Sequence, residues 1–223
     1  MAKQAKSAAK RDTLTRDRML RTAVRLADKE GIESLSMRRL ARVLDVNPMS
    51  LYNHVADKDD LLDGLADIAI GEIEVPSGGG EWKSAMRRRA ISAREMLERH
   101  PWAAGLIESR ANSSPARLRY PEAVVGSLRQ AGFSVEMSLH AFFALDSYIY
   151  GFAVQQHNLP AGTPEELGRV AEMTLAALPP EEYPYLRELI VDYVAKVGFR
   201  YEDEFAFGLE LILDGLERAL QAD

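Results

Sequence analysis

Enzymatic or metal chemistry in this 223-residue chain would have to come from few residues, because it holds four histidines and no cysteine. Glu136 and His140 are four residues apart, a spacing that suits a metal ion on a helix, but no third ligand accompanies them. Ser7 and Lys10 form an S-x-x-K pattern only within a polar tail. The sequence shows neither a phosphate-binding glycine loop nor a nucleophile elbow. We therefore predict no enzymatic activity, no metal and no cofactor.

The segment NPMSLYNHV, residues 47–55, suggests a different chemistry. Asn47 can cap a helix, and Pro48 suits the first helical position because it has no N–H to leave unpaired. Helices below about 12 residues are marginal in water, so this one must bury one face. Leu51 and Val55 can pack against the preceding helix, which carries Leu40 and Leu44. The other face is left to meet a partner.

A short helix, a turn over residues 45–47 and a second short helix form a helix-turn-helix unit, whose second helix enters the major groove of DNA. Hydroxyl, imidazole and cationic groups there can meet phosphates and base edges, and a methionine can meet a thymine methyl. Two alternatives stay open, in which Tyr52 packs on its own domain and Lys58 is only a solvated helix start. The residues proposed from this pattern are Arg38, Met49, Ser50, Tyr52, His54 and Lys58.

The charge distribution favours a polyanionic partner for the N-terminal part. The net charge is −6, yet residues 1–58 hold 13 Lys/Arg against 7 Asp/Glu. A basic run can also be a merely solvated face, so charge alone leaves both interpretations open. No apolar stretch is long enough to span a membrane, and the polar start has no signal-peptide segment. We expect a soluble cytoplasmic protein, in a reducing compartment because cysteine is absent.

Hydrophobic periodicity predicts helices nearly throughout and no sustained strand alternation, so the fold class is all-α with about nine to ten helices. The segment PSGGG, residues 76–80, is the clearest internal break. We predict a disordered tail (1–11), a three-helix helix-turn-helix domain (12–58) and a larger C-terminal ligand-binding and dimerisation domain (59–223). Long helices are expected at residues 82–98, 116–130, 135–156, 165–178, 185–196 and 200–221.

The segment SMRRLARVLDVNPMSLYNHVADKDDLLDGLA, residues 36–66, resembles the DNA-binding segment of the tetracycline-repressor (TetR) family of bacterial transcription factors. The resemblance rests on L-A-x-x-L-x-V, L-Y-x-H-V and K-x-x-L-L. It extends to EWKSAMRRRA and RQAGFSVEMSLHAFFALDSYIYGF, which are similar to the tetracycline-repressor-like subgroup. It implies base contacts from Arg38, Pro48, Met49, Ser50, Tyr52 and His54, with Tyr52 and Lys58 near phosphate. Asp45 replaces the usual glycine, but aspartate can adopt the left-handed conformation.

The resemblance implies a repressor that binds a palindromic double-stranded DNA operator as a homodimer and is released by a small-molecule effector. The dimer would form through the helices at 135–156 and 200–221. An apolar stripe on the last helix (Phe205, Leu209, Ile212 and Leu216, with Gly208 and Gly215) could serve this contact or equally be protomer core. The differing residues Asn47, Pro48 and Met49 predict an operator unlike that of the tetracycline repressor. A helical ligand-storage module that no longer binds DNA is the remaining alternative.

Family ligand positions correspond to Met86, Arg89, Ile107, Val124, Leu128, Phe142, Phe143 and Asp146. Ile107 and Gln155 stand where tetracycline sensors have a histidine and a carboxylate for the magnesium–drug complex, so we predict that the effector is not magnesium-tetracycline. The apolar members could instead be core. Arg89 and Asp146 could pair with each other, bind a charged ligand or lie on the surface.

Overall fold

The computed structural model describes residues 14–76, 81–110, 114–158, 163–179, 181–198 and 200–222. The tail predicted at residues 1–11 and most of the PSGGG break lie outside these ranges. The described part of the chain is helical and has no strand, as the all-α prediction requires. None of the helices described is both long and apolar enough to cross a membrane.

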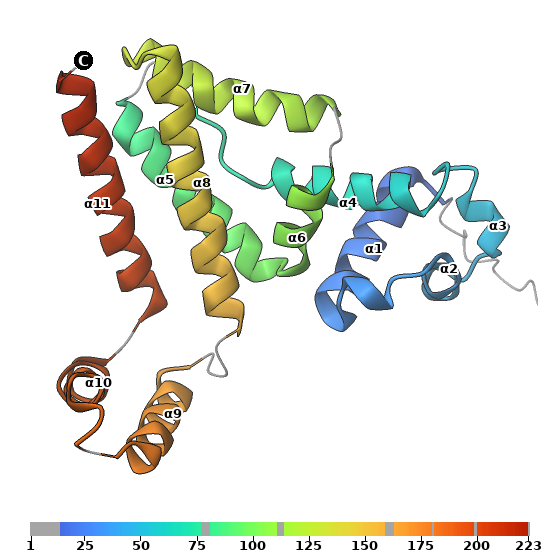
Figure 1. Cartoon of the computed structure of the whole chain (residues 1–223). Helices are drawn as coiled ribbons and strands as arrows, with labels where there is room; N and C mark the ends of the chain where they lie inside the picture. Colours follow the sequence, from blue (N-terminus) through green and yellow to red (C-terminus); the bar gives the residue numbers. More distant parts are fainter. Residues whose placement is uncertain are drawn as a thin grey trace, which may run out of the picture.

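The described residues form eleven α-helices, slightly more than the nine to ten predicted, and two further helical segments, η1 and η2. They are α1 (Arg16–Glu30), η1 (Ile32–Ser34), α2 (Met37–Leu44), α3 (Pro48–Leu51), α4 (Lys58–Gly71), α5 (Trp82–Arg99), α6 (Trp102–Ser109), α7 (Pro115–Gln130), α8 (Val135–Asn158), α9 (Pro164–Ala177), α10 (Pro184–Leu189), η2 (Ile190–Gly198) and α11 (Tyr201–Ala222). Figure 1 shows α1–α3 at one side of the molecule and α8 and α11 side by side at the other.

The first three helices begin where their capping residues predict. The side chains of Thr15, Ser36 and Asn47 each accept a hydrogen bond from a backbone N–H of the first turn that follows. Met19 of α1, Leu40 of α2 and Leu51 of α3 are fully buried and hold the three helices together. The small domain is therefore built by local capping plus one shared apolar core.

The helix α4 connects this domain to the rest of the chain (Figure 1). It contacts α1 on one side and α6 and α7 on the other. A side chain at Gly64 would come within 2.6 Å of a methyl group of Leu20, so α4 and α1 cross very closely there. Asp60 pairs with Arg16 of α1 at 2.8 Å, and Asp63 accepts from Arg110 Nε at 2.6 Å. The helix α4 is thus tied to both parts.

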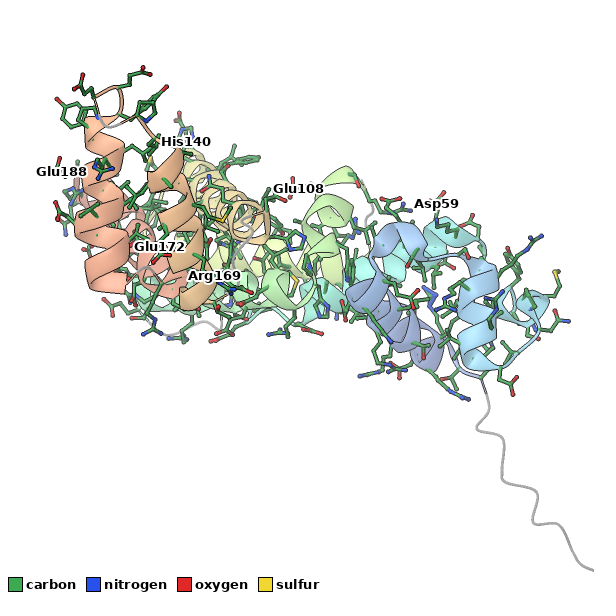
Figure 2. All side chains as sticks on the ribbon, turned by 90° about the horizontal axis from the view of Figure 1, so that it is seen from below. Asp59, Glu108, His140, Arg169, Glu172 and Glu188 are labelled. Atoms are coloured by element: carbon green, nitrogen blue, oxygen red, sulfur yellow. The ribbon has the colours of Figure 1, made fainter. Side chains whose placement is uncertain are left out.

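In the larger part, α5, α8 and α11 pack together, and charged pairs fasten their edges. Arg87 of α5 pairs with Glu210 at 2.5 Å, and Lys83 pairs with Asp214 at 2.7 Å, both on α11. Figure 2 shows the overall length of the molecule, with Asp59 near the end formed by α1–α3 and His140 and Glu188 at the opposite end.

The apolar stripe predicted on the last helix is largely core of the protomer itself. Phe205, Leu209 and Leu216 are at most 8% exposed in the single chain. Gly208 faces Tyr148 of α8, whose hydroxyl oxygen would lie 2.3 Å from an added Cβ. Of the two alternatives for this stripe, a dimer contact or protomer core, the buried residues therefore follow the second.

Candidate functional site

The backbone around α3 is fixed by three residues of the preceding turn and helix start. Asp45 ends α2 in the left-handed conformation, with φ 54° and ψ 48°, as the sequence suggested it could. Asn47 Oδ1 accepts from the Met49 N–H at 2.9 Å, and Pro48 takes the first helical position. Leu51 is fully buried and Val55 is 3% exposed, so the inner face is anchored.

The outer face of α3 is open. Met49 is 70% exposed and Tyr52 is 45% exposed, so Tyr52 does not pack into its own domain. Pro48 is exposed too, whereas Ser50 and His54 are half-buried. A single-turn helix therefore presents a methionine and a tyrosine beside hydrogen-bonding groups to its surroundings.

Exposed cations lie on the helices before and after α3. Arg38 and Lys58 are exposed and form no ion pair with any residue that the structure describes, and the same holds for Arg42. Arg39 differs, because it pairs with Glu30 at 2.7 Å on the flank of the domain. These charges on α2 and at the start of α4 are thus available to an anionic partner.

A cavity of about 410 Å³ lies in the larger part, walled by α4, α6, α7 and α8. Its size falls within the range of small-molecule sites, about 300–1,000 Å³. Four of the proposed ligand residues line it, namely Ile107, Phe142, Phe143 and Asp146. The wall also contains residues that were not proposed: Ile70, Glu108, Arg110, Arg117, Tyr120, Pro121, Ser147 and Tyr150.

The other proposed ligand residues lie behind the wall. Met86, Val124 and Leu128 are fully buried in the core and do not line the cavity, which is the alternative stated for apolar residues. Arg89 is also fully buried, and its Nε donates to the Tyr120 hydroxyl at 2.7 Å. Its Nη2 donates to the Asp146 carboxylate, so these two charges pair with each other.

Burial shifts the pKa values of the acidic groups around Arg89. Burial raises the pKa of the Asp146 carboxyl, and the Arg89 guanidinium offsets part of the rise. Burial and the Asp146 charge raise the pKa of Tyr120 to about 12, although Arg89 acts against them. The pKa of Tyr150 is raised in the same way, chiefly by burial. Both tyrosines consequently carry their hydroxyl protons at neutral pH.

A second cluster joins the two parts of the molecule at the α5–α6 junction. The buried His100 contacts Asp28 of α1 through Nδ1 at 2.6 Å and Glu72 through Nε2 at 3.3 Å. Trp102 Nε1 donates to the same Asp28 carboxylate at 2.7 Å. Burial opposes ionisation of Glu72, but the hydrogen bond from Arg99 and the charge of His100 lower its pKa. No spacing in the sequence points to His100, because its carboxylate partners lie far from it along the chain.

The capped α2–turn–α3 unit with its exposed outer face defines the class of this protein, a helix-turn-helix protein with a separate helical domain that encloses a cavity. Residues 19–65 match the family described as bacterial regulatory proteins of the tetR family. Residues 75–220 match the tetracyclin repressor-like C-terminal domain. The chain belongs to the TetR family of bacterial transcriptional regulators.

Individual relatives cover most of the chain. It is 35% identical over 214 residues to the HTH-type transcriptional repressor DrrR1 of Streptomyces coeruleorubidus, covering 92% of this chain and 78% of that protein. It is 28% identical over 216 residues to the Escherichia coli tetracycline repressor protein class D, covering 94% and 92%. The Streptomyces coelicolor TetR family protein ActR in complex with actinorhodin superposes with a TM-score of 0.76 at 31% identity, covering 93% of this chain and 99% of that one.

Proposed function

We propose that this protein is a ligand-responsive transcriptional repressor that binds a palindromic operator as a homodimer. The observation that carries the proposal is the outer face of α3, exposed and flanked by cations that pair with no described residue. Relatives named as repressors, DrrR1 among them, support repression as the mode of action. We assign no enzymatic activity, and we place the DNA-binding domain at residues 12–58 and the ligand-binding and dimerisation domain at 59–223.

In this proposal the face of α3 reads bases and its borders hold phosphates. Arg38, Pro48, Met49, Ser50, Tyr52 and His54 contact base edges, while Tyr52 and Lys58 also lie near the backbone. Arginine can form two hydrogen bonds with guanine, and the exposed methionine suits a thymine methyl. Met49 and its neighbours Asn47 and Pro48 then decide which operator is preferred.

The homodimer is supported by apolar side chains that the single chain leaves exposed on α8 and α11. Phe207 and Leu211 of α11 are 66% and 57% exposed, and Leu139 and Val154 of α8 are 54% and 48% exposed. Large apolar side chains left exposed on two packed helices favour association with a partner, which would cover them. Gly215 follows Leu211 by one helical turn and would let a partner helix approach. Two copies of α3 would need a separation of about 34–36 Å to enter successive major grooves.

The effector site in this proposal is the cavity of about 410 Å³. ActR has been solved with actinorhodin and with (S)-DNPA, which supports a small-molecule ligand for this fold. An effector that prefers the DNA-incompetent arrangement weakens DNA binding, and DNA must weaken the effector by the same factor. Because Ile107 lines the cavity and Gln155 is exposed on α8, we expect that effector not to be magnesium-tetracycline.

The proposal is tested by titrating a duplex DNA at several salt concentrations. A protein that displaces counterions from phosphates should show a linear fall of log K with log[salt]. Tyr52→Ala and Lys58→Ala should weaken binding to all duplexes alike. After operator fragments are selected from genomic DNA, Arg38→Ala should relax selectivity at one base position by about 1–3 kcal/mol.

Arg39→Ala is the matched control, because Arg39 is adjacent to Arg38 but is paired with Glu30. It should change stability little, because the pair is solvent-screened, and it should leave base selectivity unchanged. A flat salt response would favour the alternative of a ligand-storage module. Unchanged selectivity in Arg38→Ala would refute the assignment of Arg38 to a base.

A further inference from the structure

One side chain in the cavity wall has hydrogen-bonding capacity that the protein does not use. Arg117 of α7 lines the cavity and is only 7% exposed. Its Nη1 donates to the Arg110 carbonyl at 2.6 Å, but Nε and Nη2 have no hydrogen-bond partner among the residues that the structure describes. Buried donors are nearly always paired, since an unpaired one loses its hydration without gaining a hydrogen bond. This guanidinium is therefore missing an acceptor.

The two unpaired groups form one edge of the guanidinium. Nε–H and Nη2–H point in the same direction, so together they match the two oxygens of a carboxylate. The nearest protein carboxylate is Asp67 of α4, at 3.5 Å from Nε, which is too long and misaligned for a hydrogen bond. Asp67 instead accepts from Ser114 Oγ at 2.7 Å.

The other charged side chains at the cavity are paired with protein residues or exposed to solvent. Asp146 is paired with Arg89, and the Arg110 guanidinium is bound to Asp59 and Asp63 of α4. Glu108 also lines the cavity, but it is exposed, so solvent screens its charge. The buried side chain of the cavity wall that lacks partners is thus cationic.

The rest of the wall suits a flat apolar body. Phe142 and Phe143 meet edge to face, with ring centroids 6.0 Å apart, and Tyr120 and Tyr150 complete an aromatic lining. Aromatic rings pack well against planar apolar groups. We infer that the effector is a planar aromatic carboxylate, whose two carboxylate oxygens accept hydrogen bonds from Arg117 Nε and Nη2.

This inference rests on the proposed function, and it connects ligand binding at Arg117 to the helix α4. Ligand oxygens on the free edge of Arg117 compete with Asp67 for the same guanidinium. The ligand therefore weakens a contact between α7 and α4 at the moment it binds. Asp67→Asn, which removes the competing charge, should strengthen carboxylate binding without affecting a neutral analogue.

The test compares anthraquinone-2-carboxylate with anthraquinone-2-carboxamide by titration calorimetry on the full chain. Wild type should bind the carboxylate about 10- to 100-fold more tightly, as expected for hydrogen bonds to a charged partner. Arg117→Met should abolish that preference. Arg117→Lys should reduce it, because an ammonium cannot form the paired bonds. Arg119→Met, an exposed position on the same helix, is the matched control and should keep it.

Thermal unfolding of each variant shows whether it is folded. If Arg117→Met is unfolded, the carboxylate preference of Arg117→Lys and Asp67→Asn is compared with that of wild type instead. Equal binding of both probes by wild type, no binding of either at millimolar concentration, or a preference that survives in folded Arg117 variants would overturn the inference. Retardation of duplex DNA is measured on the same preparations. If wild type does not bind duplex DNA, the proposed function is wrong. If it binds DNA but shows no preference for the carboxylate, this inference alone is wrong.

Discussion

Gly208→Ala should destabilise the protomer at the contact between α8 and α11. An added Cβ would lie 2.3 Å from Tyr148 Oη and 2.8 Å from its Cζ. The Tyr148 ring cannot move aside freely, because it stacks on Phe205 with centroids 5.3 Å apart, and its hydroxyl donates to the Phe205 carbonyl at 2.9 Å.

The size of the effect follows from three contributions. Overpacking a tight core contact costs about 1–3 kcal/mol. Losing the tyrosine hydrogen bond costs roughly 0.5–1.5 kcal/mol more. Replacing glycine by alanine within a helix returns up to about 1 kcal/mol. The free energy of unfolding of Gly208→Ala should therefore fall by about 0.5–4.5 kcal/mol, as measured by urea denaturation at several protein concentrations.

Gly215→Ala is the matched control on the same helix. No atom of the described protomer lies within 4 Å of a Cβ at Gly215. Alanine there should not destabilise the single chain, but it should raise the dissociation constant of the dimer in sedimentation experiments. Wild-type stability in Gly208→Ala would refute the packing argument, and an unchanged dimer in Gly215→Ala would remove Gly215 from the proposed interface.

Three further outcomes are expected. Leu51→Ala should lower the free energy of unfolding by about 2–5 kcal/mol in urea denaturation, because Leu51 is fully buried, whereas Met49→Ala at a 70% exposed position should leave stability unchanged and alter operator preference. Asn47→Ala removes the cap of α3 and should lower stability by about 1 kcal/mol, with weaker binding to every duplex. The hydrogen bond from Arg87 lowers the pKa of Glu210 below its ordinary value of 4.5, so the pair stabilises the fold above that pH and ceases to do so as pH falls through the lowered pKa. At neutral pH the free energy of unfolding of Glu210→Gln should be lower than that of wild type by no more than about 1 kcal/mol. The melting temperatures of the two proteins should therefore differ slightly at neutral pH and converge in acid. A difference that stays constant with pH would contradict the pairing.

The helix-turn-helix unit was predictable because its determinants are local. Asp45, Asn47 and Pro48 specify the turn and the start of α3 through their own backbone and capping preferences. The burial of Leu51 and exposure of Met49 follow from their spacing on one helix. The turn and the orientation of α3 are therefore determined almost entirely by residues within about ten positions of each other in the sequence.

The cavity depends instead on contacts between distant helices. Arg117 and Tyr120 reach the wall only because α7 packs across α8, and no spacing within α7 distinguishes them from Val124, which is core. The same limit applies to the stripe of α11, because periodicity shows that Phe205 and Leu209 are covered but not whether the same chain or a partner covers them.

The acidic residues of α4 show how the two regions are connected. Asp60 pairs with Arg16 of α1, Asp63 with Arg110 after α6, and Asp67 lies beside Arg117 of α7.

These contacts differ in strength along the helix. The Arg16–Asp60 pair is 44% and 36% exposed, so it contributes little by itself. The N-terminal half of α4 is held to α1 chiefly by apolar packing, through the fully buried Leu61 and Leu65 and the close crossing at Gly64. The C-terminal half buries Ala66, Ala69 and Ile70 as well, and it also places Asp67 beside Arg117 in the cavity wall. A ligand that engages Arg117 would therefore weaken the contact of Asp67 with α7, and we expect the packing of α4 against α1 to pass that change to α1–α3.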